Sequence, residues 1–125
     1  MCSTTPRASS ELLVSHEAPG EARAFLRTAS CHEHNGAVVD DAVLLVSELV
    51  TNSVLHGGPP LVVAVDCDGT ALQVRVRDGS PELPAPRVAG PDAENGRGMA
   101  LVDALSDNWG VERDENGKHV WFVLR

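Results

Sequence analysis

The sequence contains few aromatic residues and a single lysine. Aromatics make up 3% of the 125 residues and tyrosine is absent, so the core must be built mainly from Ala, Val and Leu. A phosphate-binding P-loop needs Gly-x-x-x-x-Gly-Lys followed by Ser or Thr. Around Lys118, Glu112 stands in place of the first Gly and His119 in place of Ser or Thr, so a P-loop is excluded. The strand lysine, catalytic-loop aspartate and Asp-Phe-Gly motif of eukaryotic-type kinases are also missing.

Long apolar runs and paired cysteines are absent as well. No apolar run approaches the roughly 20 residues that cross a bilayer, and residues 1–10 lack the apolar centre of a signal peptide. Cys2, Cys31 and Cys67 form an odd set without close pairing, which is typical of reduced thiols in the cytosol. We therefore expect a cytoplasmic protein that does not bind membranes.

Positive charge is scarce relative to negative charge. The formal net charge is -8 and the isoelectric point is about 4.9. An acidic surface repels phosphate backbones, which disfavours nucleic acid as a direct partner. A protein partner with a basic or mixed surface fits better, although the charge also serves solubility.

The length fits one domain. We expect a flexible tail at 1–9 and a single domain at 10–125, with a Pro- and Gly-rich lid at 79–95. The other expected elements are an edge strand within 10–17, helices at 18–30, 37–56 and 96–107, and strand pairs at 61–68 with 71–78 and 109–114 with 118–125. This order predicts an α+β fold, a two-layer sandwich in which about three helices cover one face of a mixed, mostly antiparallel sheet.

The stretch "SELVTNSVLHGG" (47–58) places polar side chains at every fourth position of a helix. Glu48 and Asn52 share one face, and His56 lies within the same broad stripe. For an arbitrary helix, such a stripe is most often a solvated face. We interpret His56 as a residue of the helix end or of a phosphate's surroundings.

Two further features favour a functional role for the stripe of Glu48 and Asn52 over a solvated helix face. Asp78 ends a strand and is followed by Gly79, and a carboxylate there can accept a hydrogen bond from an exocyclic amine such as that of adenine; a turn-starting Asp is the ordinary alternative. Gly96, Arg97 and Gly98 open a helix, where free backbone N–H groups favour an anion. A lone Gly-x-Gly is weak by itself, and only the combination is informative.

The stretch "CHEH" (31–34) is compatible with either a metal site or a surface loop. Cys31, His32 and His34 are ligand types, but no second ligand cluster lies at zinc spacing. The surface loop is the better interpretation.

Three motifs together resemble the GHKL ATPase superfamily. "SELVTNSVLHG" resembles its N box, "VRDGSP" part of its first glycine box, and "GRGMALVDALSDNWG" its second glycine box. Within the superfamily, residues 10–124 are most similar to small bacterial anti-sigma-factor serine/threonine kinases, in the stand-alone actinomycete form.

The resemblance implies ATP and Mg²⁺ as cofactors. It implies that Glu48 is the base for the attacking hydroxyl, that Asn52 is the Mg²⁺ ligand, and that Asp78 binds the adenine amine. The remaining implied cofactor-binding residues are Gly79, Gly96, Arg97, Gly98 and Met99, the last of which is also a candidate core residue.

The chain departs from the family pattern at two places. The segment Asp78-Gly79-Ser80-Pro81-Glu82 lacks two glycines of the Asp-x-Gly-x-Gly box. The family usually has a Thr on the last strand, and here we expect His119 at that place. Both departures concern nucleotide affinity rather than the fold.

The expected function is phosphorylation of a small anti-sigma-factor antagonist protein and binding of a sigma factor. Related proteins are often dimers, so a homodimer is an option. The alternative is a nucleotide-binding interaction module with weak or no kinase activity. Glu48 and Asn52 favour the kinase, whereas the altered glycine box and His119 favour the module, and the sequence leaves this choice open. A stand-alone ATPase fits less well, because we expect a single domain, with no second domain for ATP turnover to move.

Overall fold

The computed structural model describes residues 7–30, 36–67, 71–80 and 94–125. The elements in chain order are β1 (Arg7–Leu12), α1 (Ala18–Ala29), α3 (Val39–His56), β2 (Leu61–Cys67), β3 (Leu72–Asp78), α4 (Glu94–Leu105), β4 (Asn108–Asp114) and β5 (Gly117–Leu124).

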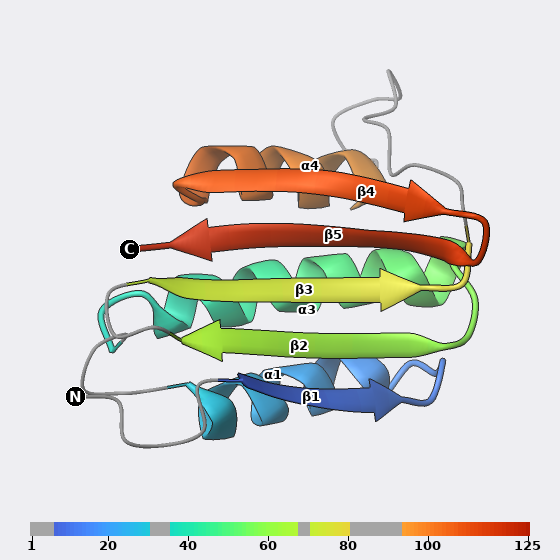
Figure 1. Cartoon of the computed structure of the whole chain (residues 1–125), viewed down its shortest axis with the longest axis horizontal. Helices are drawn as coiled ribbons and strands as arrows, with labels where there is room; N and C mark the ends of the chain where they lie inside the picture. The colour runs from blue at the N-terminus through green and yellow to red at the C-terminus, as the bar shows by residue number, and fades with distance from the viewer. Residues whose placement is uncertain (1–6, 31–35, 68–70, 81–93) are drawn as a thin grey trace.

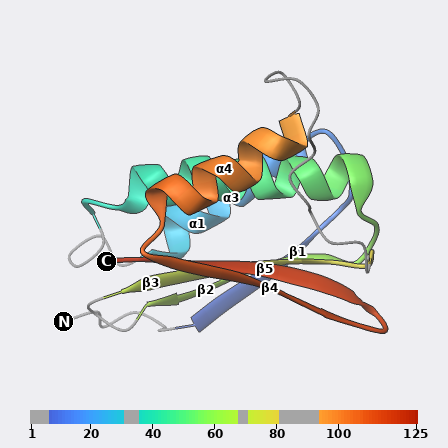
Figure 2. The same cartoon turned by 90° about the horizontal axis from the view of Figure 1, so that it is seen from above.

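The strands form one sheet in the order β1-β2-β3-β5-β4, and every pair of neighbours is antiparallel. The three helices of the described residues, α1, α3 and α4, lie together on one face of this sheet (Figures 1 and 2). The predicted α+β sandwich is therefore confirmed. Within the described residues, no helix is both long enough and apolar enough to span a bilayer.

The helices form where apolar residues recur at helical spacing. In α1, Pro19 lies in the first turn, and Ala18, Ala22 and Leu26 are fully buried. The buried face of α3 is lined by Val, Leu and Ala, which are Val39, Ala42, Val43, Leu45, Val46, Leu49 and Val50. This apolar face orients the helix, so the polar stripe beside it is held in a fixed position.

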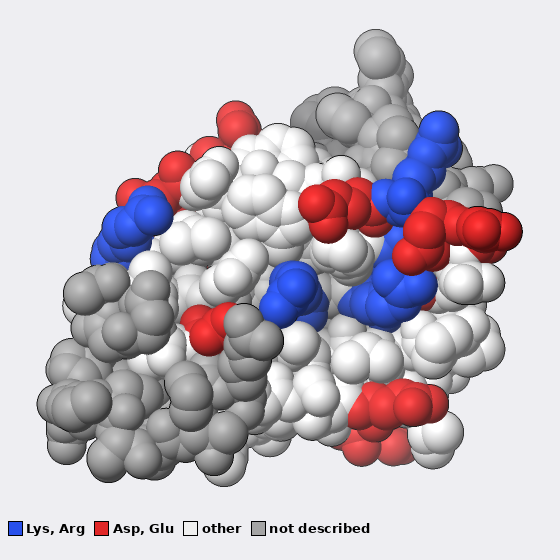
Figure 3. All heavy atoms as spheres, in the orientation of Figure 1, with Lys and Arg blue, Asp and Glu red and all other residues white. Residues whose placement is uncertain are grey.

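Strands β2 and β3 alternate between buried and partly buried residues, as the sequence predicts for a sheet covered on one face. In β3, Leu72, Val74 and Val76 are buried, and the residues between them turn to the other face. Figure 3 shows that other face of the sheet, where basic side chains lie among acidic and uncharged ones. Phe122 of β5 is the largest fully buried side chain of the core.

Several expected boundaries differ from the structure. The edge strand begins at Arg7, within the expected tail at 1–9, and ends at Leu12 rather than continuing to residue 17; residues 1–6 lie outside the described residues. Helix α4 begins at Glu94, two residues before the Gly-Arg-Gly motif. Most of the expected lid (81–93) and the "CHEH" segment also lie outside the described residues.

Candidate functional site

The polar stripe of α3 lies beside the face that packs on the sheet. Glu48 and Asn52 are partly buried, and His56, the last residue of the helix, is exposed. Ser53, one residue after Asn52, is buried and turned toward the sheet. The helix therefore presents a carboxylate and an amide one turn apart at the border between its buried and its exposed surface.

Asn52 is the unusual member of this stripe. Both polar atoms of its side chain, Oδ1 and Nδ2, have less than 1 Å² exposed, and neither has a hydrogen-bond partner among the described residues. A buried polar group without a partner costs about 1–3 kcal/mol, and native proteins rarely keep one without a reason. An amide oxygen is also a ligand that Mg²⁺ accepts. Asn52 therefore fits a cation or a phosphate-bearing ligand.

Asp78 lies at the end of β3, and its side chain is 3% exposed. Its Oδ1 accepts hydrogen bonds from the Ser80 backbone N–H (2.9 Å) and from Lys118 Nζ (2.9 Å). Its Oδ2 accepts from Ser53 Oγ (2.8 Å) and again from Lys118 Nζ (3.0 Å). One carboxylate thus joins the end of α3, the end of β3 and the start of β5.

Two glycines allow these chain segments to approach one another. A Cβ on Gly57, the residue after α3, would lie 2.7 Å from the carboxylate carbon of Asp78. Gly117, at the start of β5, has φ 147°, and a Cβ there would lie 2.1 Å from the Asp78 carbonyl oxygen. Gly79 adds a hydrogen bond, because its N–H donates to the Gly58 carbonyl (2.6 Å). The surroundings of Asp78 therefore depend on residues without side chains.

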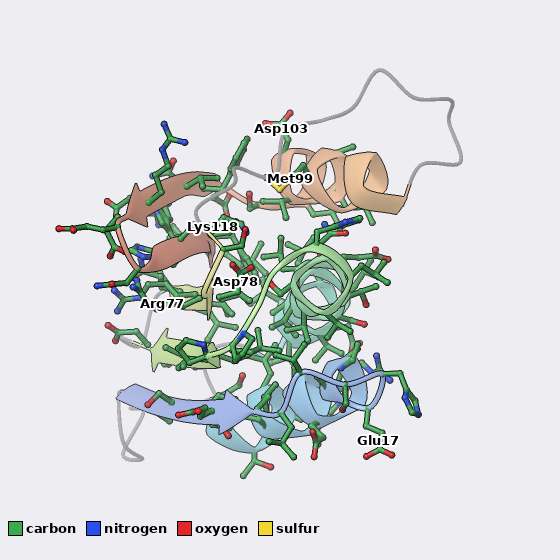
Figure 4. The ribbon with its side chains drawn as sticks, turned by 90° about the vertical axis from the view of Figure 1, so that its right-hand side faces the viewer. Glu17, Arg77, Asp78, Met99, Asp103 and Lys118 are labelled. Atoms are coloured by element: carbon green, nitrogen blue, oxygen red, sulfur yellow. The ribbon has the colours of Figure 1, made fainter. Side chains whose placement is uncertain are left out.

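The expectation for His119 is wrong. Strands β3 and β5 pair so that Asp78 lies opposite Lys118 and Arg77 lies opposite His119. Because alternate residues of a strand point to opposite faces, Lys118 turns to Asp78, whereas His119 lies on the other face and pairs with Glu112 (Nε2 to Oε2, 2.7 Å). Figure 4 shows Asp78 and Lys118 side by side, between the sheet and α3.

Sequence reasoning missed Lys118 as a site residue, although a signal for it was present. Val120, Phe122 and Leu124 alternate along β5 and are buried. Counting back by two from Val120 places Lys118 on the same inward face. The alternation therefore predicts an inward lysine, whose charge then requires a buried partner.

The Gly-Arg-Gly motif lies at the start of α4. Gly96, Arg97 and Gly98 are its third to fifth residues. Only the first four backbone N–H groups of a helix lack helical partners, so Gly98 lies beyond them; the Arg97 side chain is outside what the structure describes. Met99 is 5% exposed and belongs to the core. The start of α4 and the end of α3 lie at the same side of the molecule in both Figure 1 and Figure 2.

A comparison with protein families identifies this arrangement. The model of the histidine kinase-like ATPase domain matches residues 14–124, nearly the whole chain. The chain belongs to the histidine kinase-like ATPase domain family. A search of curated proteins found no significant match.

Several solved structures share the fold at low sequence identity. One is the structure of the RsbU and RsbW domains of Rv1364c from Mycobacterium tuberculosis, with 22% identity and a TM-score of 0.72. The alignment covers 97% of this chain and 32% of that one, so the chain spans about a third of that protein's length.

Two further structures are of the blue-light-activated histidine kinase EL346 of Erythrobacter litoralis. Its histidine kinase domain gives 18% identity and a TM-score of 0.54, over 82% of this chain and 60% of that one. A second structure of the kinase gives 20% and 0.55, over 84% and 39%.

Within this histidine kinase-like ATPase domain, Asn52 fits the expected nucleotide site. Asp78 differs from the expectation that its carboxylate is free to bind adenine. The buried, unpaired amide of Asn52 fits Mg²⁺ or a phosphate. The carboxylate of Asp78 is instead engaged by Lys118 within the chain. The roles of Glu48, Asp78, Gly79 and the Gly-Arg-Gly motif in binding or catalysis remain predictions.

Proposed function

We propose that this histidine kinase-like ATPase domain binds Mg·ATP and transfers phosphate to a Ser or Thr of a small protein antagonist, in the manner of the anti-sigma-factor kinases that it resembles. The family match over residues 14–124 supports the nucleotide. The Glu48–Asn52 stripe on α3 supports the phosphotransfer.

The observation that carries this proposal is the Asn52 side chain. Its two polar atoms are buried and unpaired among the described residues, on a well-packed helix that cannot rotate to expose them. A position that served stability alone would favour an apolar residue there. A bound cation gives the amide oxygen a partner and accounts for the arrangement.

The chain's own groups have distinct roles in this proposal. ATP supplies the phosphoryl group. Asn52 holds Mg²⁺ through its amide oxygen, and backbone N–H groups at the start of α4 bind phosphate oxygens. Glu48, one turn before Asn52, accepts the proton of the attacking hydroxyl.

Partners follow from the same resemblance. One of the similar structures contains an RsbW domain beside an RsbU domain, which supports a regulatory partner protein for this chain too. We propose an anti-sigma-factor antagonist as the substrate and a sigma factor as the binding partner. The acidic surface, with a net charge of -8, favours partners that present basic residues.

A second candidate function is a protein-interaction module with weak or no phosphotransfer. The observation that favours it is the ion pair between Asp78 and Lys118. A carboxylate held by an internal cation contributes less to nucleotide binding than a free one. The two candidates differ in whether Glu48 and Asn52 act on a bound nucleotide.

Calorimetric titration with ATP, with and without Mg²⁺, tests the proposed function. Asn52→Ala should weaken binding by about tenfold or more when Mg²⁺ is present, because a ligand of the cation is lost. Asn116→Ala, in the exposed turn before β5, is the matched control and should bind like the parent. Equal affinity of Asn52→Ala and the parent, with both folded, would contradict the assignment.

A further inference from the structure

The hydrogen-bonding capacity of the Asp78 carboxylate is fully used. An ionised carboxylate offers about four lone-pair positions. Four hydrogen bonds reach it, two on each oxygen, from the Ser80 N–H, the Ser53 hydroxyl and twice from the Lys118 ammonium, at 2.8–3.0 Å. A further donor can bond to Asp78 only if one of these donors leaves.

Lys118 is the donor that a ligand is able to displace. The Ser80 N–H belongs to the backbone, and the Ser53 hydroxyl is held by buried helix α3. The Lys118 ammonium is the end of a four-carbon side chain with rotatable bonds, and that side chain is 9% exposed. Besides Asp78, it donates weakly to the Ser80 carbonyl oxygen at 3.4 Å, so each of its three N–H groups has an acceptor.

We propose that Lys118 is a specificity-determining residue, because its ammonium occupies the position on Asp78 that the exocyclic amine of a bound base would take. This inference rests on the proposed function, in which a nucleotide binds with its base toward Asp78. A base that hydrogen-bonds Asp78 must first displace Lys118. The internal ion pair therefore lowers the affinity for adenine nucleotides and leaves binding dependent on Mg²⁺ and the phosphates.

A purely structural role of the pair makes a different prediction. If Lys118 only ties the start of β5 to the end of β3, its removal changes stability and leaves nucleotide affinity unchanged or weaker. If Lys118 competes with the base, its removal raises adenine affinity even though it lowers stability. Affinity and stability then change in opposite directions, which a structural role does not produce.

The first experiment compares parent, Lys118→Thr and Lys118→Met by calorimetry with Mg·ATP, Mg·GTP and Mg²⁺ with tripolyphosphate, which carries no base. Both variants should bind Mg·ATP about tenfold more tightly than the parent, while tripolyphosphate affinity changes little. Guanine has an oxygen where adenine has the amine, so Mg·GTP should gain less. Arg113→Met, opposite Lys118 on β4 and exposed, is the matched control for a lost cation and should resemble the parent.

The outcomes separate this inference from the proposed function. If the parent binds Mg·ATP and the folded Lys118 variants bind it no more tightly, the inference fails and the function stands. If only the variants bind, the inference holds and the parent acts as a module. If no form binds any nucleotide, both fail, because freeing Asp78 has not produced a base site.

A second measurement uses the parent protein and needs no variant to fold. Since Lys118 is the only lysine, protein that carries ¹⁵N at the lysine Nζ gives one side-chain ammonium signal. Millimolar Mg·ATP should shift or broaden that signal as the ammonium leaves Asp78, whereas tripolyphosphate with Mg²⁺ should not. An unchanged signal at a concentration of Mg·ATP that saturates the parent in calorimetry would overturn the inference.

Discussion

The buried pair of Asp78 and Lys118 allows a prediction of stability with a calculable size. The side chains are 3% and 9% exposed, and removing one partner of such a pair leaves an uncompensated buried charge. The expected cost is about 3–5 kcal/mol. At about 2.1 cal/mol/K of unfolding entropy per residue, the 125-residue chain has roughly 0.26 kcal/mol/K, so the midpoint of thermal unfolding should fall by roughly 11–19 °C.

A double-mutant cycle isolates the interaction. Asp78→Asn and Lys118→Met should each show this loss in thermal and urea unfolding. The double variant should regain at least about 2 kcal/mol relative to the sum of the single losses, because no charge remains buried and the amide oxygen introduced by Asp78→Asn still accepts hydrogen bonds in the place of the carboxylate. Single losses below about 1 kcal/mol, or strictly additive losses, would refute the reasoning, because a pair that behaves so is solvated or unformed.

Three other positions allow tests of the described contacts. Glu48→Gln should lower phosphotransfer to a co-purified partner by about 10²–10⁴-fold while calorimetry shows nearly unchanged Mg·ATP affinity; full transfer would place the base elsewhere. Gly57→Ala should lower the free energy of unfolding in urea by about 1–3 kcal/mol, because the added Cβ would lie 2.7 Å from the Asp78 carboxylate. Gly58→Ala is the control and should be tolerated, because a Cβ there meets nothing within 4 Å. Equal stability of the two variants would count against the close approach of Gly57 to Asp78. Hydrogen bonds from the Asn116 N–H and the Arg77 guanidinium hold the pKa of Asp114 below its usual 3.8. The ionised Asp114 carboxylate therefore stabilises the fold above pH 3.8, and this stabilisation is lost as the pH falls through the lower pKa of the folded state. Asp114→Asn should therefore flatten the acid side of the stability curve, and an identical acid limb in parent and variant would rule this out.

The fold was predictable from the sequence because its local signals agree with one another. Val39, Val43, Val46 and Val50 mark the buried face of α3, and the alternation in β3 marks its inward residues. The start of β1 was not predictable. Its sequence, "RASSEL", has little apolar character, and it is a strand only because β2 offers a free edge for pairing.

The site was predictable where side chains act from one element and less so where elements meet. Helical spacing alone places Asn52 on one face with Glu48, and the resemblance to the N box marks it as a candidate ligand. The partner of Asp78 depends on the register between β3 and β5, which places Lys118 and not His119 opposite it. The family motif indicates His119 as the residue near Asp78. The alternation of inward and outward residues along β5 indicates Lys118 instead. The register between two strands is a tertiary property. The sequence indicates it here only through the alternating buried residues Val120, Phe122 and Leu124.

The pairing of β1 has a consequence for the order in which the chain folds. The pairs β2–β3 and β4–β5 join neighbours in the sequence, so each closes a short loop. Among the described strands, β1 pairs only with β2, and Leu12 lies opposite Leu61 across a connection that holds both α1 and α3. Closing the longer loop costs more chain entropy and slows contact formation. We therefore expect β1 to dock late in folding and to open first in the native state, which makes this edge the natural point of entry for partial unfolding.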